Sequence, residues 1–505
     1  MDETTGAAVA SSEEPTSDVE VTRPERPDRG LLIEGGAVVT VDRDPAVGPF
    51  TIHDPGWVHV VDDRIAGVGP GPAPAEVRAL AGHHIDATGR AVMPGMVNAH
   101  THLFQTFFRG LADDKALLDW LRDCIWPGAV HLDATSARLA ALLGLVENLR
   151  TGATSVIDHQ YIHPADGGGA EAIDDAVCSA ADGTGIRFLL ARGWADRNYE
   201  PRLTESAATV LDRAERTRLR WHGHDGNRIR VELAPLIPWG CSDEAMIDTV
   251  AASRSWGAGT HVHCAETRVE VEMSLEERGV RHVPWLDGLG VLGPDTQLAH
   301  SVWLDDDELD LVAERGSVVV HCPVSNMYLA SGVARVLEMR QRGIPVALAS
   351  DGPGSNNRQD LFEAMKATVL LQKVNHLDPV ALQPEDCLAM ACLGGARALG
   401  QADQLGAIEV GRLADLVVVD LRSVFTAPVH RVASALVYTA TPAHVSHVVV
   451  DGRIVIDDGR LTMLDEGRLL AAADAAARRV FASVDVASRL RSDRRPAPEP
   501  GPTRE

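Results

Sequence analysis

Hydrophobic runs alternate with amphipathic stretches of helical period through the middle of the chain. Segments such as residues 134–152 and 360–374 repeat apolar residues at three- and four-residue spacing, which is typical of helices packed on one face. Between such segments lie eight short apolar runs that predict buried strands: residues 91–100, 154–159, 185–194, 228–239, 259–266, 296–304, 316–326 and 345–351. Eight strands alternating with helices predict an α/β fold, a (β/α)8 TIM barrel over residues 94–404, with its active site at the carboxyl ends of the strands.

The two flanking regions have a different pattern. Residues 31–93 and 405–462 consist of short β-branched runs joined by Gly and Asp turns, as in "LLIEGGAVVTVD" and "VSHVVVDGRIVIDDGRL". The simplest packing joins them into one small composite β-sandwich built from both chain ends. Residues 463–490 predict an Ala-rich amphipathic helix, and the polar segments 1–30 and 491–505 predict disordered tails.

The composition argues against two classes of partner. The 505-residue chain has a formal net charge of −25, and its sequence lacks the basic stripe that binding to a nucleic-acid polymer requires. We therefore expect no nucleic acid partner. No apolar stretch approaches the roughly 20 residues of a membrane span, so we expect no membrane partner either. The seven cysteines are scattered and form no C-x-x-C pair, which predicts reduced thiols in a cytoplasmic protein.

Polar side chains gather at the ends of the predicted strands. The run "VNAHTH" places His100 and His102 two residues apart, so on a strand both rings face one space and can bind one ion. Taken alone, the pair is equally typical of two hydrogen-bonded histidines.

Three further strand ends carry side chains of the same kind. His261 and His263 share a face in "HVHCAE", and Glu266 follows His263 by three residues. His300 ends the run "LAH", and Asp351 ends "ALASD". Each residue alone is commonly structural. Nitrogen donors and a carboxylate on one rim of a barrel favour a zinc-type metal site with one position open for water.

These segments resemble a known family. "PGMVNAHTH", "HCAET", "LAHSVWL", "CPVSNMYLASG" and "ASDGPGSNN", in this order and spacing, are similar to the amidohydrolase superfamily, in particular its cytosine-deaminase-like branch of aminotriazine, purine and pterin hydrolases. The resemblance covers roughly residues 31–462. It implies metal ligands at four positions, which are His100, His102, His263 and Asp351. It also implies a proton shuttle at Glu266 and a water-orienting or substrate-polarising histidine at His300.

The lysine content bears on the number of metal ions. Two-metal members of the superfamily usually bridge their ions with a carbamylated lysine at the end of the fourth strand, and no lysine lies between Lys115 and Lys366. A carboxylate could bridge two ions in place of that lysine, but the candidate, Glu232, falls in the middle of the fourth strand and not at its end. We therefore predict one divalent metal ion, with zinc preferred and iron as the alternative.

A single divalent ion predicts a hydrolytic mechanism. Such an ion lowers the pKa of bound water toward 7, so that hydroxide is available at neutral pH. Asp351 and His300 can orient the water and take its proton, while Glu266 carries a proton to a ring nitrogen. We expect deamination of an aminated nitrogen heterocycle, a purine, pterin or triazine-like free base, with these three residues as the catalytic groups.

The substrate is less well defined by the sequence. "HTHLFQTFFRG" and "VIDHQY" look most like the 8-oxoguanine and hydroxyatrazine aminohydrolases. We predict substrate contacts from Gln105, whose amide can both donate and accept, from Trp239, which can stack on a ring, and from His159. A solvent-facing Gln105 and purely structural roles for the other two are the alternatives. Where adenosine-type members carry a histidine in "A-P-H-S-P", this chain has Leu236 and Ile237, which argues against a nucleoside substrate.

Two other functions stay open at this point. A hydrolase of the same architecture could expel another group, chloride from a triazine or an amine from an amidine. A catalytically dead scaffold is the third hypothesis, and the complete set of predicted ligands argues against it. We also expect a homodimer or a higher homo-oligomer that binds a small heterocyclic substrate.

Overall fold

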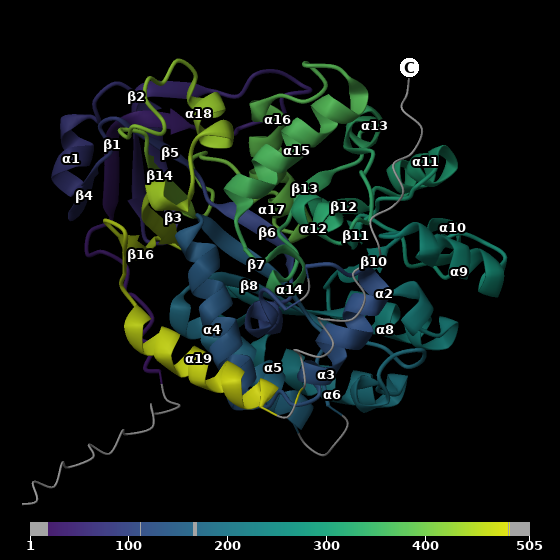
Figure 1. The fold of residues 1–505 in the computed structure, drawn as a ribbon. Helices are drawn as coiled ribbons and strands as arrows, with labels where there is room; N and C mark the ends of the chain where they lie inside the picture. Colours follow the sequence, from purple (N-terminus) through teal and green to yellow (C-terminus); the bar gives the residue numbers. More distant parts are fainter. Residues whose placement is uncertain (1–18, 112, 165–168, 483, 485–505) are drawn as a thin grey trace, which may run out of the picture.

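Eight parallel strands and the helices that connect them form the larger part of the molecule (Figure 1). In the computed structural model, which describes residues 19–111, 113–164, 169–482 and 484, these strands pair in sequence order. They are β6 (Met96–Thr101), β7 (Ala153–Gln160), β8 (Arg187–Trp194), β9 (Ile229–Pro235), β10 (Thr260–Cys264), β11 (Thr296–His300), β12 (Val318–His321) and β13 (Val346–Leu348). The predicted barrel is confirmed.

Helices follow the strands around the barrel and cover its outer face (Figure 1). The longer ones are α4 (Ala134–Arg150), α5 (Gly169–Thr184), α6 (Ala207–Trp221), α8 (Asp243–Ser255), α9 (Arg268–Arg278), α11 (Asp306–Arg315) and α15 (Leu361–His376). Shorter helical segments near the strand ends include η1 (Leu103–Phe108), α2 (Leu117–Trp120), η4 (Pro238–Gly240), α10 (His282–Gly288), α12 (Pro323–Tyr328), α13 (Val336–Gln341) and α14 (Pro353–Asn356). Local sequence sets where helices begin: Thr267 and Glu270 form a reciprocal capping box at the start of α9.

Hydrogen bonds at the carboxyl end close the barrel between its first and last strands. The backbone N–H of Asp351, just past β13, donates to the carbonyl of His100 on β6 at 3.0 Å. Asn98 of β6 accepts from the N–H of Ser350 at 3.0 Å and donates to its hydroxyl at 2.8 Å. These bonds hold Asp351 against the strand that carries His100 and His102.

A second, mixed sheet is built from both ends of the chain. Its nine strands are β1 (Leu31–Val39), β2 (Ile52–Val61), β3 (Arg64–Pro70), β4 (His83–Asp86), β5 (Arg90–Pro94), β14 (Leu416–Asp420), β15 (Val445–Val450), β16 (Arg453–Asp457) and β17 (Arg460–Leu461). The two ends meet where β5 pairs antiparallel with β14. The prediction of a barrel with a small β-domain from both chain ends is therefore confirmed.

One predicted strand is two. The run over residues 91–100 is divided at Gly95: β5 belongs to the mixed sheet, and β6 begins the barrel. A Cβ on Gly95 would lie 2.0 Å from the Thr154 hydroxyl oxygen, so only glycine fits where the chain passes from one sheet to the other. Hydrophobicity runs on through this point, which is why the pattern alone did not separate the two strands.

The C-terminal helix α19 (Glu466–Phe481) lies along α4 (Figure 1). It begins after the N-cap Asp465, three residues later than predicted from the 463–490 segment, because the Asp465 carboxylate accepts from the N–H of Arg468. Residues 483 and 485–505, which include the predicted C-terminal tail, lie outside the described residues.

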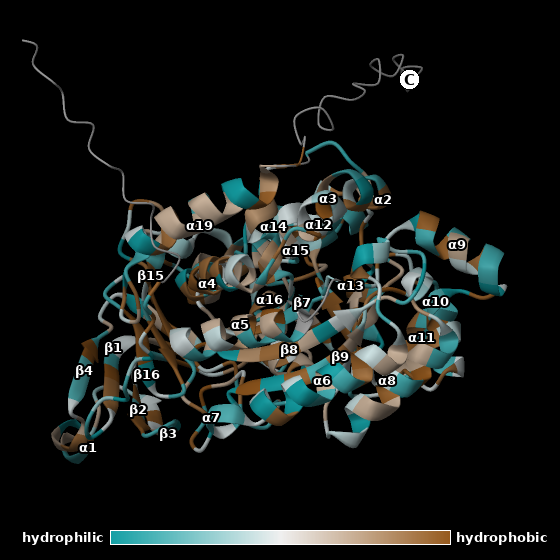
Figure 2. Ribbon diagram, turned by 90° about the horizontal axis from the view of Figure 1, so that it is seen from below, coloured by the Kyte–Doolittle hydropathy of each residue, from teal (hydrophilic) through white to brown (hydrophobic). Residues whose placement is uncertain are grey.

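Hydropathy follows the layers of the fold. Figure 2 shows hydrophobic residues along strands of both sheets, and hydrophilic residues on helices such as α6 at the outside. In the part of the chain that the structure describes, no helix combines the length and apolar character needed to span a bilayer.

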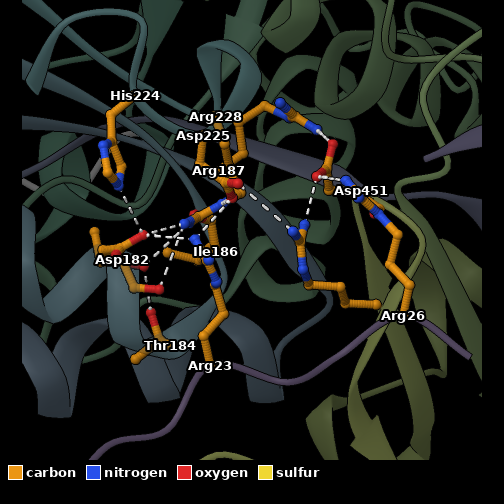
Figure 3. Close-up of polar contacts among 12 residues, drawn as sticks. Arg23, Arg26, Asp182, Thr184, Ile186, Arg187, His224, Asp225, Arg228 and Asp451 are labelled. Atoms are coloured by element: carbon orange, nitrogen blue, oxygen red, sulfur yellow. Dashed lines mark hydrogen bonds and ion pairs between the residues drawn. The ribbon is translucent and has the colours of Figure 1, made fainter. Parts of the chain in front are cut away.

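Residues 19–30 pack against the body of the protein, although the sequence predicts a disordered tail over residues 1–30. Arg23 and Arg26 pair with carboxylates of the barrel and of the mixed sheet (Figure 3). The prediction is wrong for this part, because a polar composition does not reveal distant charged partners. Residues 1–18 lie outside the described residues.

A buried ionic cluster joins the barrel, the mixed sheet and the N-terminal segment. Arg187 of β8 donates twice to Asp415, at 3.0 Å each, and lies 3.4 Å from Asp451. Asp451 in turn accepts from Arg26 at 2.5 Å (Figure 3). Arg187 is fully buried, so its Nε and Nη2 donors depend on these carboxylates rather than on water.

Candidate metal centre and active site

Three histidine side chains converge inside the carboxyl end of the barrel. β6 contributes His100 and His102, whose alternation along the strand directs both rings to one side, and β10 contributes His263. One ring nitrogen of each lies within 4.8 Å of those of the other two. Oδ1 of Asp351 is 3.4 Å from Nε2 of His100 and 3.2 Å from Nε2 of His102. The structure thus brings together the four residues predicted as metal ligands.

Each ring is held through its Nδ1 atom. Nδ1 of His102 donates to the carbonyl of His159 at 2.8 Å, and Nδ1 of His263 donates to the carbonyl of Leu236 at 2.6 Å. A carbonyl only accepts, so these rings carry their proton on Nδ1 and keep a lone pair on Nε2. Nε2 of His100 is buried and has no hydrogen-bond partner among the described residues.

Burial keeps the rings in the form that binds metal. It lowers the pKa of His100 to about 3 and lowers the pKa of His263 well below its ordinary value, so both are neutral at pH 7. Neutral imidazole is the ligand form of histidine. Three imidazole nitrogens and one carboxylate, with an orphaned Nε2 among them, fit one divalent ion of the zinc type.

Asp351 is held as a carboxylate by its neighbours. Its Oδ2 accepts from the hydroxyls of Ser325 at 2.6 Å and Ser355 at 2.9 Å, and its Oδ1 accepts from the N–H of Gly352 at 2.7 Å. Burial raises its pKa, but the nearby imidazoles of His100 and His102 outweigh burial and hold the pKa well below the ordinary value. Its φ of 63° is uncommon for a residue other than glycine, and such strained turns cluster at functional sites.

Glu266 and His300 form a second group beside the ligands. Oε2 of Glu266, just past β10, lies 3.6 Å from Nε2 of His300 at the end of β11. Oε1 of Glu266 accepts from the Ser331 hydroxyl at 3.1 Å, and Nδ1 of His300 donates to Oδ1 of Asn326 at 3.0 Å. Burial, reinforced by the charge of Asp351, raises the pKa of Glu266 to about 8. Glu266 is therefore protonated at neutral pH and can donate a proton.

A cavity lies against these groups. The predicted ligands His102, His263 and Asp351 line one part of its wall, together with Glu266 and His300. Its other side is aliphatic and aromatic, and includes Leu117, Trp120, Leu121, Leu236, Ile237 and Trp239. Polar chemistry on one side and apolar surface on the other is the arrangement expected for binding a flat, weakly polar ring.

The sequence profile of the amidohydrolase family matches residues 91–455, which span every residue of this site. The chain belongs to the amidohydrolase family. The match covers the whole barrel and the return into the mixed sheet, so it includes both parts of the fold.

Curated relatives of this amidohydrolase are named as deaminases. A 5'-deoxyadenosine deaminase of Methanothermobacter thermautotrophicus is 41% identical over 422 residues, which are 84% of this chain and 94% of the relative. A 5-methylthioadenosine/S-adenosylhomocysteine deaminase of Syntrophobacter fumaroxidans is 37% identical over 444 residues, covering 86% of this chain and 94% of the relative. This amidohydrolase is accordingly an enzyme that deaminates an aminated heterocycle, acting on a carbon–nitrogen bond.

Solved structures agree with this assignment. An adenosine deaminase from Xanthomonas campestris with bound zinc superimposes with a TM-score of 0.82 at 31% identity, covering 91% of this chain and 100% of that chain. A zinc complex of atrazine chlorohydrolase from Arthrobacter aurescens gives a TM-score of 0.82 at 25% identity, covering 88% of this chain and 100% of that one. The amidohydrolase fold is thus established over nearly the whole chain, and one neighbour above 30% identity binds zinc.

Two of the three predicted substrate-binding residues line the cavity of this amidohydrolase. Nε2 of Gln105 donates to the Tyr161 hydroxyl at 2.9 Å, which leaves its buried Oε1 without a partner among the described residues. Nε1 of Trp239 donates to Glu270 at 3.1 Å, so its hydrogen-bonding group is already occupied. Gln105 therefore offers an acceptor, and Trp239 offers its ring.

His159 lies apart from the cavity, which corrects its prediction as a substrate contact. Its ring is fully buried, 4.8 Å from the ring of His263 between centroids and tilted by 24°. Nε2 of His159 donates to the carbonyl of Ala234 at 3.3 Å, and its own carbonyl accepts from His102. Because the side chain points into the packed barrel interior, His159 supports the predicted ligands and does not reach a substrate.

Several partners in the site were missed by sequence reasoning. Asn326 and Ser331, which hold His300 and Glu266, lie in "CPVSNMYLASG", a segment noted only for its resemblance. Tyr161 ends "VIDHQY", a segment in which only the histidine was assigned. A search for every polar residue in the loops that follow the barrel strands would have found all three, since those loops build the site.

Proposed function

We propose that this amidohydrolase uses one divalent metal ion, zinc in preference to iron, to remove the 6-amino group of the adenine ring in a small nucleoside such as 5'-deoxyadenosine. The names of the relatives at 37% and 41% identity support the substrate class, and the zinc in the adenosine deaminase neighbour supports the metal. The observation that carries the chemistry is the 3.6 Å distance between Glu266 and His300 beside the cluster of histidines and Asp351.

The predicted ligands would hold the ion through three imidazole nitrogens and one carboxylate: His100, His102, His263 and Asp351. When bound, the ion supplies a water molecule whose pKa is lowered toward neutrality. The lack of any lysine between Lys115 and Lys366 supports one ion over a lysine-bridged pair.

Glu266 supplies a proton to the ring. Protonated at neutral pH, it donates to the ring nitrogen next to the amino-bearing carbon, which makes that carbon more electrophilic. The Ser331 hydroxyl holds one carboxyl oxygen, so the other remains available to the ring. His300, oriented by Asn326, and Asp351 accept the proton that the attacking water releases. That proton then passes to the amino group, which leaves as ammonia, and the remaining hydroxyl proton returns to Glu266 as the carbonyl forms.

Gln105 and Trp239 orient the heterocycle. The unpartnered Oε1 of Gln105 accepts an N–H of the ring or of its amino group, and the face of Trp239 stacks on the ring. Leu117 and Leu121 contribute apolar surface to the same cavity. Such surface suits a nucleoside whose 5' end carries no hydroxyl or charge.

The free base is a second candidate, favoured by one observation. Leu236 and Ile237 line the cavity at the segment where adenosine-type members carry a histidine, and neither can hydrogen-bond a sugar hydroxyl. Expulsion of another group, such as chloride, is the remaining alternative.

Ammonia release from a panel of ring compounds tests these choices. The panel consists of 5'-deoxyadenosine, 5-methylthioadenosine, adenosine, adenine, guanine, an amino-substituted pterin, and amino- and chlorotriazines. Each compound is assayed with the zinc-loaded protein and with the metal-free protein. We expect zinc-dependent ammonia release with the highest kcat/KM for 5'-deoxyadenosine. Adenine as the best substrate would select the free-base candidate, and chloride release without ammonia would contradict deamination.

A cytoplasmic location and a homo-oligomeric state complete the proposal. The seven cysteines all lie buried among the described residues and none forms a disulfide there, which supports a reducing compartment. The oligomeric state stays a prediction, and light scattering of the purified protein tests it.

A further inference from the structure

A chain of polar side chains runs through the barrel core from the predicted ligand His100 toward the opposite mouth of the barrel. Nδ1 of His100 lies 2.8 Å from Nε2 of His261, which is hydrogen-bond distance, and the two rings are parallel within 1°. Nδ1 of His261 lies 3.1 Å from Oε1 of Gln297. The Gln297 amide in turn lies beside the carboxyl group of Glu232, and both border the same position at Gly259.

Every link of this chain is shielded from water. His261 is fully buried, Gln297 is 4% exposed and Glu232 is 1% exposed. Glu232 and Gln297 border a cavity at the amino-terminal mouth of the barrel, together with Arg230, Gly259 and other residues. Interactions among buried polar groups are stronger than at a surface, and unmade bonds there are costly.

Gly259 makes the far end of the chain fit. A Cβ at this position would lie 2.8 Å from Nε2 of Gln297 and 2.9 Å from Oε2 of Glu232. The Gln297 amide therefore places its nitrogen beside Glu232 and Gly259 and its oxygen toward His261.

The direction of each hydrogen bond follows from the orientation of the Gln297 amide. Oε1 of Gln297 can only accept, so His261 carries its proton on Nδ1 and presents a lone pair at Nε2. Nε2 of His261 then accepts from Nδ1 of His100. His100 is left with its lone pair on Nε2, the atom that faces Asp351 at 3.4 Å.

We propose that His261, Gln297 and Glu232 are positioning residues that fix the tautomer and ring orientation of His100 and thereby set the affinity of the metal site. This inference rests on the proposed metal site and extends it to three residues outside the cavity. Mutation of a partner that hydrogen-bonds the second nitrogen of a ligating histidine commonly weakens metal affinity about 10- to 100-fold.

Zinc affinity measured by chelator competition tests the proposal. Gln297→Met keeps the approximate shape of the side chain and removes the acceptor for His261, so we expect zinc binding to weaken about 10-fold. The same assay on the wild-type protein tests the metal site itself, and a wild-type protein without zinc affinity would contradict the proposed function. Zinc affinities of wild type and Gln297→Met that agree within twofold would contradict only the positioning role of these three residues.

A matched control and a rescue separate positioning from packing. Thr260→Val alters a neighbouring buried polar side chain whose hydroxyl has no partner among the described residues, and we expect its zinc affinity to stay within twofold of wild type. The exchange Glu232→Gln/Gln297→Glu keeps an acceptor for His261 at position 297 and places an amide donor beside it at position 232, so it should restore the affinity that Gln297→Met loses. A loss in Thr260→Val equal to that in Gln297→Met, or no recovery in the exchange variant, would overturn the proposal.

A second variant applies if Gln297→Met does not fold, as judged by its melting curve. Glu232→Leu removes the group that orients the Gln297 amide without touching a predicted ligand, and we expect about threefold weaker zinc binding, less than for loss of Gln297 itself. Unchanged affinity in Glu232→Leu would equally overturn the proposal.

Discussion

Oε2 of Glu266 lies 3.6 Å from Nε2 of His300, in a pocket where both side chains are almost fully buried. Burial separates their roles. The carboxyl group of Glu266 has a pKa raised to about 8, so it keeps its proton at neutral pH. Nδ1 of His300 is bound to Asn326, which fixes the orientation of the ring. A proton donor and a proton acceptor therefore stand side by side next to the predicted ligands, which is the arrangement that hydrolytic deamination needs.

Glu266→Gln removes the proposed proton donor and keeps the size of the side chain. We expect kcat on the best substrate of the panel to fall about 1,000-fold, because general acid catalysis contributes in this range. The zinc content should match that of wild type, since Glu266 is not among the predicted ligands. Metal analysis and ammonia release on the same preparation check this, and full turnover with zinc retained would refute the role of Glu266.

The pH profile should report the same group. The pKa of Glu266 is raised by burial to about 8, so its donating form predominates below that pH and is lost above it. We expect kcat/KM of the zinc-loaded enzyme to fall about tenfold per pH unit above about 8. The residual activity of Glu266→Gln should lack this alkaline limb, and an identical limb in both proteins would assign it to another group.

Trp239 provides a test of substrate stacking. Trp239→Leu removes the aromatic face and should raise KM about 10-fold, since an aromatic contact contributes roughly 0.5–1.5 kcal/mol. Trp239→Phe keeps a face but loses the hydrogen bond to Glu270, and its KM should stay within about threefold of wild type. Equal KM increases in the two variants would indicate that the bond to Glu270, and not stacking, is what matters.

The buried ionic cluster should be important for stability. Asp415→Ala leaves the fully buried Arg187 without its bidentate partner, and we expect the free energy of unfolding to fall by about 3 kcal/mol. Arg23→Ala removes two partly exposed ion pairs, with Asp182 and Asp225, where the expected loss is below about 1 kcal/mol. Urea unfolding of both variants measures the difference, and losses of equal size would show that burial does not govern this cluster.

The sequence predicted the barrel and most of the site because both follow from local periodicity. Alternation on a strand placed His100 and His102 on one side, and the carboxyl ends of parallel strands meet at one rim, so Glu266, His300 and Asp351 could be grouped without coordinates. The full ligand set and the chemistry of an aminohydrolase were implied by the resemblance of the surrounding motifs to the amidohydrolase superfamily.

What the sequence could not provide depends on distances across the fold. The bond between His100 and His261 joins residues 161 positions apart, and the Gln297 contact adds a third strand, so no local pattern indicates it. His159 was assigned to the substrate because it lies in "VIDHQY", which resembles the 8-oxoguanine and hydroxyatrazine aminohydrolases; only the packing around it shows that the ring is enclosed.

The most direct test of the account is a zinc titration of metal-free protein followed by ammonia release from 5'-deoxyadenosine. The account predicts no activity without metal, a linear rise on adding zinc, and a plateau at one equivalent per chain. Activity in the metal-free protein, or a rise that continues to two equivalents, would contradict the claim that one metal ion held by His100, His102, His263 and Asp351 drives the reaction.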